Sequence, residues 1–272
     1  MIYKCNKCGK SMHWDVNQNK LVCDCGSTEY TEFSNMSDAT CDVCGYYIKD
    51  NLIAQLCENC KSNIINKSLE NDIAGISLPK MDKTSAIDSI MLFINRLSFH
   101  KKIHKATAQL LYLPYDVISG EIVYDNNEKQ AISDVCVYTG EDKDKKLRSR
   151  WQFETNDVVE FDDRYLCGSF AYSRDKRREV IEMAKSTKIQ VIADGKTCTD
   201  FNETQDFYVL FPVYHIRIND KYDYYLNGTT NEIEGTRYRS LISVIKYEIL
   251  KYTALLIILI SSLFVFGGAF RL

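Results

Sequence analysis

The chain has 272 residues, with 34 Lys and Arg against 37 Asp and Glu, and a formal net charge of -3. A composition that is 45% hydrophobic and 26% charged is typical of a globular protein and excludes an intrinsically disordered chain. The slight acidity speaks against a protein that coats DNA, because such proteins carry a basic excess. The unusual feature is the number of cysteines, which is 11.

Eight of these cysteines lie in the first 60 residues, where they form four close pairs. An odd total, and an N-terminus that leads from Met1 directly into this pattern, argue against a secreted protein held by disulfides. Reduced cysteines that bind metal ions in a cytosolic domain are the better interpretation. The candidate ligands are Cys5, Cys8, Cys23, Cys25, Cys41, Cys44, Cys57 and Cys60.

The second group of four has the stronger spacing. Cys41 and Cys44 form one Cys-x2-Cys turn, and Cys57 and Cys60 form another after twelve residues. Each turn places two thiolates on one side, and two turns complete the tetrahedron that Zn²⁺ prefers. Dithiol redox chemistry is the alternative, but no β-α-β pattern surrounds either pair. We therefore predict a zinc ribbon over residues 38–64.

The first group has one irregular turn. Cys5 and Cys8 are followed after fourteen residues by Cys23 and Cys25, which only one residue separates. This short turn can still chelate a metal, and His13 is an alternative ligand. We predict a second zinc ribbon over residues 1–34. Four protein ligands leave no open coordination position, so both predicted Zn²⁺ sites are structural.

The charge of this region indicates its partner. Residues 1–66 contain six Lys and eight Asp or Glu. The release of counterions from a nucleic-acid backbone would therefore contribute little to the free energy of binding. We expect these ribbons to contact a protein, with nucleic acid unlikely.

The middle of the chain predicts an α+β domain. Residues 65–82 are polar and suggest a linker, and residues 83–240 mix helical and strand patterns dominated by antiparallel pairing. Asp82 or Thr84 can cap one helix, and Ser173 can cap another. The strand-like segments are 109–115, 120–124, 134–138, 189–193, 208–218 and 222–226, with Asn219-Asp220 and Asn227-Gly228 as turns.

A local pattern occurs twice in this domain. Residues 111–115 read Leu-Tyr-Leu-Pro-Tyr, residues 210–214 read Leu-Phe-Pro-Val-Tyr, and each run leads through a short spacer into a further strand. Because proline lacks an amide donor, we expect Pro114 and Pro212 to lie at a sheet edge or at a bulge. Coincidence of two aromatic hairpins is the alternative.

The C-terminal part predicts a membrane anchor. Residues 252–270 contain no charged side chain, and a helix of this length spans roughly 28 Å, close to the hydrocarbon thickness of a bilayer. A buried core helix is the alternative, but a globular helix of this length normally has a polar face. Arg237, Arg239, Lys246 and Lys251 precede the segment and only Arg271 follows it. The positive-inside rule therefore predicts a single-pass protein of the cell membrane with cytoplasmic N-terminal domains.

No catalytic motif accompanies these features. Residues 193–197 end like a phosphate-binding loop, but position 190 is Gln instead of the required Gly. Cys136, Cys167 and Cys198 are isolated and are expected in the core. We predict that the protein is not an enzyme and has no small-molecule substrate.

These features together resemble a bacterial family of membrane-anchored double zinc-ribbon proteins, commonly labelled TFIIB-type zinc-ribbon or primosomal-helicase-like. The resemblance spans most of the chain. It rests on the eight cysteines, on Tyr112-Leu113-Pro114-Tyr115, and on the stretch from Leu210 to Gly235 with its Asn227-Gly228-Thr229-Thr230. It implies two zinc ribbons, an α+β domain and a membrane-anchoring C-terminus. The helicase label is not carried over, because no ATPase motif is present.

The chain departs from the family pattern at the short Cys23-x-Cys25 turn, and at Tyr115 and Tyr214, where the family often has Phe or Trp. Some members are linked to membrane-stress modules, so the resemblance implies partners of the SPFH type or the PspA type. The leading hypothesis is a membrane-anchored cytosolic adaptor that recruits a protein partner. The alternatives are a membrane-tethered nucleic-acid binder and a metal-responsive sensor.

Overall fold

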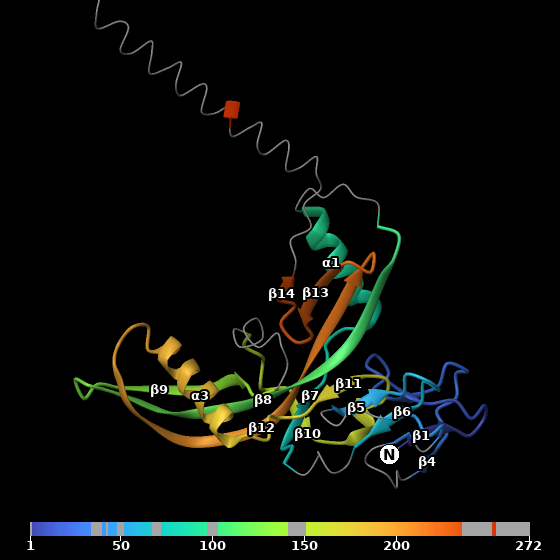
Figure 1. Ribbon diagram of the computed structural model, residues 1–272, viewed down its shortest axis with the longest axis horizontal. Coiled ribbons are helices and arrows are strands. Elements are labelled where there is room, and N and C mark those ends of the chain that lie inside the picture. The colour runs from blue at the N-terminus through green and yellow to red at the C-terminus, as the bar shows by residue number, and fades with distance from the viewer. Residues whose placement is uncertain are drawn as a thin grey trace, which may run out of the picture.

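Two long strands form the centre of the fold. The computed structural model describes residues 2–33, 40–41, 43–47, 52–66, 72–96, 103–140, 151–235 and 252–253. Strand β8 (Ala106–Tyr124, 19 residues) pairs antiparallel with β12 (Cys198–Ile218, 21 residues) along its whole length. The pair sweeps through the molecule from helix α3 (Arg178–Ile192) at one end to helix α1 (Lys83–Arg96) at the other (Figure 1).

Shorter strands extend this pair into a ten-stranded sheet. The path through the sheet runs β10-β7-β12-β8-β11-β5-β6, while β9 pairs with β8, β13 with β12, and β14 with β13. Among the described pairs, only β7–β12 and β11–β8 are parallel, as expected for a mainly antiparallel sheet. The added strands are β5 (Leu52–Leu56), β6 (Asn63–Ile65), β7 (Gly75–Ser77), β9 (Lys129–Tyr138), β10 (Val158–Glu160), β11 (Phe170–Tyr172), β13 (Tyr222–Asn227) and β14 (Ile233–Gly235).

The sheet is built from two copies of one β-α-β-β unit. The first unit is β7-α1-β8-β9 and the second is β11-α3-β12-β13. The short first strand of each unit pairs in parallel with the long strand of the other: Gly75 lies opposite Val209, and Phe170 lies opposite Leu111. The two units are therefore interlocked and related by a pseudo-twofold axis that passes through the pair Leu113–Phe211.

The repeated proline pattern marks this symmetry. Pro114 and Pro212 lie in central strands and no register shift occurs at either residue, so the expectation of an edge strand or a bulge is wrong. Each proline lies where the outer neighbour of its strand changes from a short parallel strand to a hairpin partner. No ladder N–H is required there, and the proline carbonyls still accept hydrogen bonds from Thr139 N (3.1 Å) and Gly228 N (2.9 Å).

The two helices cover different parts of the sheet. Helix α1 begins as predicted, because the Asp82 carboxylate accepts a hydrogen bond from Ser85 N (2.8 Å). Its Ile90 and Ile94 are buried in the core that also contains Tyr112 and Leu210. Helix α3 packs over Ile118 and Ile122 at the other end of β8.

Helix α3 differs from its predicted bounds. It begins at Arg178 rather than near Ser173, and residues 189–192, which were expected in a strand, form its last turn. Ile189 and Ala193 are buried against the sheet one turn apart. The apolar run at 189–193 therefore reflects one buried face of a helix, which a short apolar segment does not distinguish from a strand.

The segment expected to be a linker contains part of the sheet. Residues 75–77, inside the range 65–82, form β7, and Ile76 is fully buried. Three residues are too few to show a periodicity, so only their partners β12 and β10 reveal the strand.

The cysteine-rich regions are attached to this sheet. The first consists of two small sheets, β1 (Ile2–Cys5) with β4 (Tyr30–Phe33) and β2 (His13–Asp15) with β3 (Lys20–Val22). The strands of the second, β5 and β6, belong to the main sheet through β11. The structure thus has two small four-cysteine ribbons followed by a domain that is mostly sheet.

The predicted membrane segment, residues 252–270, lies outside the described residues except for Tyr252 and Thr253. Within the described part of the chain, no helix is long and apolar enough to cross a bilayer.

Candidate metal centres

Four tight turns present the eight predicted cysteines. In the three Cys-x2-Cys turns, the N–H of the residue after the second cysteine bonds to the carbonyl of the first: Gly9 to Cys5 (2.9 Å), Gly45 to Cys41 (2.6 Å) and Lys61 to Cys57 (3.0 Å). In the short turn, Gly26 N bonds to Cys23 O (2.8 Å). The closing residue has a positive φ in all four turns, which glycine adopts without strain.

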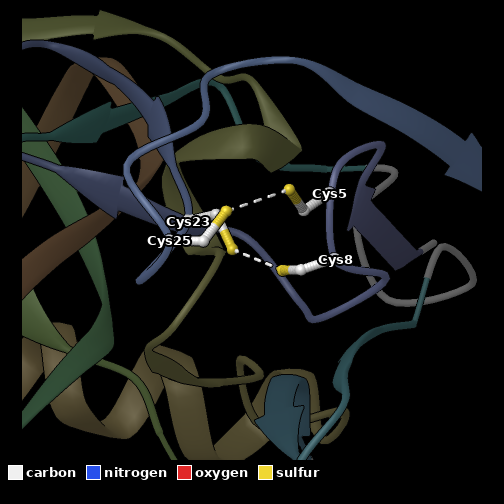
Figure 2. A group of neighbouring side chains, drawn as sticks. All are labelled: Cys5, Cys8, Cys23 and Cys25. Atoms are coloured by element: carbon white, nitrogen blue, oxygen red, sulfur yellow. Dashed lines mark hydrogen bonds between the residues drawn. The ribbon is translucent and has the colours of Figure 1, made fainter.

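The first centre brings together the thiols of Cys5, Cys8, Cys23 and Cys25. Their sulfurs lie within 4.8 Å of one another, with Cys5 Sγ 3.6 Å from Cys25 Sγ and Cys8 Sγ 3.4 Å from Cys23 Sγ. Figure 2 shows that the two turns face each other and direct the sulfurs into the space between them. The short Cys23-x-Cys25 turn therefore still supplies two ligands to the centre.

The second centre has the same geometry. Cys41 Sγ lies 3.7 Å from Cys60 Sγ, and Cys44 Sγ lies 3.6 Å from Cys57 Sγ. Cys41 and Cys57 are buried, whereas Cys44 is exposed. All eight predicted ligands are thus gathered into two groups that can each hold a metal ion.

The chemistry of each group favours a cation. Tetrahedral ligation by sulfur at about 2.3 Å requires sulfur–sulfur distances of about 3.8 Å, close to those observed. Although partial burial raises the pKa of Cys5, hydrogen bonds from the backbone N–H groups of Cys8 and Lys7 lower it to about 6. Burial raises the pKa of Cys41 to about 12, and the neighbouring thiols add to this effect. Four thiolates this close repel one another, and a bound metal ion removes that repulsion.

The alternative ligand of the first centre is placed elsewhere. His13 Nδ1 lies 3.7 Å from the Asp24 carboxylate, and His13 does not belong to the sulfur group. Of the isolated cysteines, Cys136 and Cys167 are buried and Cys198 is half-buried.

Several residues that the sequence did not single out join the first ribbon to the main sheet. Tyr3 Oη donates to the Asp163 carboxylate (2.6 Å), and Trp14 N donates to Cys167 O (2.9 Å). The Asn63 side chain donates to Met12 O and accepts from Gly168 N (3.0 Å), so it bridges both ribbons and the segment before β11. These partners are distant in the chain, and no sequence signal connects them.

A buried cluster of charges below α3 has no signal in the sequence either. Lys185 is almost fully buried, and its Nζ lies 2.6 Å from Asp206, 3.3 Å from Glu203 and 3.8 Å from Asp116. Arg174 donates to the same buried Asp116 carboxylate. Lys185 reads as a polar interruption of a helix face, so the sequence alone offered no reason to place it inside.

No protein-family model, no curated protein and no solved structure matches this chain.

Proposed function

We propose that this protein is a membrane-anchored zinc-ribbon adaptor that recruits a protein partner to the cytoplasmic face of the cell membrane. The two four-cysteine groups carry the metal part of the proposal, since thiolate ligands in tetrahedral sets select zinc. The uncharged segment 252–270 supports the anchor.

The observation that best supports a protein partner is the apolar surface of the second ribbon. Val43, Tyr46 and Tyr47 lie in and after the Cys41–Cys44 turn, and all three side chains are exposed. Tyr46 Oη is held by a hydrogen bond to the Glu58 carboxylate (3.0 Å). Exposed aromatic side chains that cluster on a small rigid element are typical of protein interfaces. Partners of the SPFH or PspA type are the class that the family resemblance suggests.

A pull-down from detergent-solubilised membranes tests this proposal. We expect Tyr47→Ala to remove the partner that the full chain captures, while zinc content stays unchanged. Leu92→Ala is the matched control, because Leu92 on α1 is 61% exposed and Tyr47 is 62% exposed. Cys57→Ser should also abolish capture, by opening the second centre.

Two further measurements address the rest of the proposal. A chain that ends at residue 251 should move from the membrane fraction to the soluble fraction. In a mobility-shift assay at physiological salt, the full chain in detergent should not bind nucleic acid tightly. Tight, salt-sensitive binding that depends on the ribbons would contradict the adaptor function and favour nucleic acid as the partner.

A further inference from the structure

The two β-α-β-β units carry different kinds of residues at three equivalent positions, although both units have the same fold. Lys80 N donates to Gly228 O in the first unit, and Asp175 N donates to Thr139 O in the second, so Lys80 and Asp175 are equivalent. The residues that precede them, Pro79 and Arg174, therefore correspond to each other. Ile90 and Lys185 are each the eighth residue of their helix. Tyr214 follows Pro212 as Asp116 follows Pro114.

The first unit fills these positions with buried Pro79, Ile90 and Tyr214, whereas the second fills them with an ionic cluster. Apolar packing is generally no less stable than a buried ion cluster. The first unit shows that this sheet and helix can be joined by apolar residues. The charges of the second unit therefore need an explanation other than stability.

A cleft opens beside this cluster. It encloses about 720 Å³, within the range of small-molecule sites. Arg174, Asp206 and Tyr208 belong to its lining, together with Lys176 and Arg178 at the start of α3. The cluster and the cleft thus form one continuous site.

The wall of the cleft has unused hydrogen-bond donors. Tyr208 is 6% exposed, and its hydroxyl makes no well-formed hydrogen bond among the described residues, although the backbone N–H of Arg174 lies near it. Arg174 Nε is likewise buried without a partner in the described part of the chain. Both groups can donate to an acceptor.

The start of α3 adds to this excess of donors. Arg177, the N-cap residue of α3, makes no side-chain capping hydrogen bond, although its own N–H donates to the Asp175 carboxylate (2.9 Å), whereas the Asp82 carboxylate caps α1. An uncapped helix start offers N–H groups and a positive dipole end to an anion. Lys176 and Arg178 are exposed beside it.

The acidic residues of the lining limit the negative charge that a ligand can carry. Asp175 is paired with Arg177 (2.9 Å), and Asp206 is paired with Lys185 (2.6 Å), which also lies close to Glu203 (3.3 Å) and Asp116 (3.8 Å). Asp72 and Glu182 also line the cleft, and neither forms an ion pair among the described residues. Two such carboxylates repel a polyanion but leave room for one small anionic group near Arg178.

We propose that this cleft binds the phosphate or carboxylate group of a small anionic ligand. Arg178, Lys176 and the first N–H groups of α3 hold the anion, and the ionic cluster below keeps Arg174 and Tyr208 in place at the wall. The first unit has no such site, because the Asp82 carboxylate of the protein itself accepts the hydrogen bond at the start of α1 that an anion would accept at the start of α3.

Calorimetric titration of the zinc-loaded full chain in detergent tests the inference. Sodium phosphate and sodium acetate are added separately at constant ionic strength, with sodium chloride as the reference. We expect saturable binding of at least one of the two anions, and the anion that binds identifies the group. Absence of saturable binding of both would overturn the inference.

The variant Arg178→Gln should weaken this binding at least tenfold. Lys83→Gln is the matched control, since Lys83 is the first residue of α1 as Arg178 is of α3. It should leave the affinity unchanged, and equal weakening by both variants would contradict the site. Tyr208→Phe should weaken binding several-fold without lowering the unfolding temperature. Unchanged affinity in that variant would also count against the site.

Discussion

The residues that close the cysteine turns determine how easily the thiols reach their positions. Gly9, Gly26 and Gly45 have φ values of 69°, 81° and 71°, and Lys61 adopts the same region at 60°. A side chain in this left-handed region is strained by contact between its Cβ and the backbone. The turn that Lys61 closes, in the second centre, therefore has a more strained backbone than the three turns that glycine closes.

Replacing Lys61 by glycine should stabilise the second centre. We expect Lys61→Gly to raise the free energy of unfolding by about 0.5–1 kcal/mol, because glycine tolerates the positive φ. The hydrogen bond from Lys61 Nζ to Glu58 O is exposed and contributes little. Chemical denaturation of the zinc-loaded protein measures the change.

Gly45→Ala provides the control for Lys61→Gly. A Cβ at Gly45 meets no atom within 4 Å, so only its φ makes the substitution unfavourable. A loss of stability in Gly45→Ala together with a gain in Lys61→Gly supports the explanation. A loss in both variants would contradict it.

Asp116 should make stability depend on pH. Burial raises the pKa of its carboxyl from 3.8 to about 6, although the Arg174 guanidinium opposes this effect. The folded protein then holds a proton that the unfolded chain has lost between pH 4 and 6. The contribution of Asp116 to stability therefore falls as pH rises through this window, by up to about 1.4 kcal/mol per pH unit.

The variant Asp116→Asn removes this titration. We expect the unfolding free energy of the wild type, relative to that of Asp116→Asn, to decrease between pH 4 and 6 and to level off above pH 6. Protonation of the metal-binding thiolates at low pH affects the stability of both proteins equally, so the difference between them isolates the titration of Asp116. A difference that is independent of pH would show that Asp116 stays ionised.

At the scale of elements, the long strands are bent by paired irregularities. The register of β8 shifts against β9 between Ile118 and Gly120, and β12 shifts between Glu203 and Gln205 on the other side. Such bulges increase local twist and bend strands. They lie in the part of the sheet that α3 covers, where β8, β9 and β12 curve together (Figure 1).

Gly120 is required at this bend because the strands approach closely. A Cβ there would lie 2.4 Å from Asn202 O and 2.8 Å from the Phe201 ring. We expect Gly120→Ala to destabilise the protein by about 2–3 kcal/mol, since the backbone of β12 has to move. Thermal unfolding measures this loss.

Glu121→Ala is the control on the same strand. Glu121 is half-buried and pairs with Lys129 at the surface (2.7 Å), so its loss should cost less than about 1 kcal/mol. Equal effects of the two substitutions would show that strand propensity, rather than the close approach, limits residue 120.

At the scale of the whole molecule, the cysteine ribbons are parts of one fold rather than separate modules. Ala54 in β5 lies opposite Ala171 in β11, so the second ribbon continues the main sheet. Met12 and Tyr3 of the first ribbon are buried in the same core as Ile90 and Tyr112. Metal binding should therefore stabilise the sheet as well as the ribbons.

Removal of the metal should expose β11. We expect a chelator to increase amide hydrogen exchange in β5, β6 and β11, since β5 pairs with both β6 and β11, while α3 keeps its protection. Mass spectrometry of the full chain in detergent, with and without chelator, measures this change. Cys57→Ser should reproduce the effect at β5 and β11, and intact protection of β11 would show that the ribbon folds independently.

The parts of the fold that could be predicted depend on neighbours in the chain. The Cys-x2-Cys turns, the Asp82 cap of α1 and the Asn219-Asp220 turn each involve a few consecutive residues. The structure places all of them as expected, with φ values of 52° and 53° at the turn. The repeated proline pattern was visible as well, but only as a local pattern that occurs twice, and the duplication of the β-α-β-β unit emerged from the strand pairing.

The rest of the fold depends on contacts between distant segments. The sequence by itself determined the eight cysteines that gather into two groups able to hold a metal ion, because spacing within a tight turn decides where a thiol points. Only the tertiary structure decided that β7 joins the sheet, that the second ribbon continues it, and that Lys185 is buried beside Asp116. A strand of three residues and a single charged residue have no period of their own, so the partners that tertiary packing brings to them determine what they do.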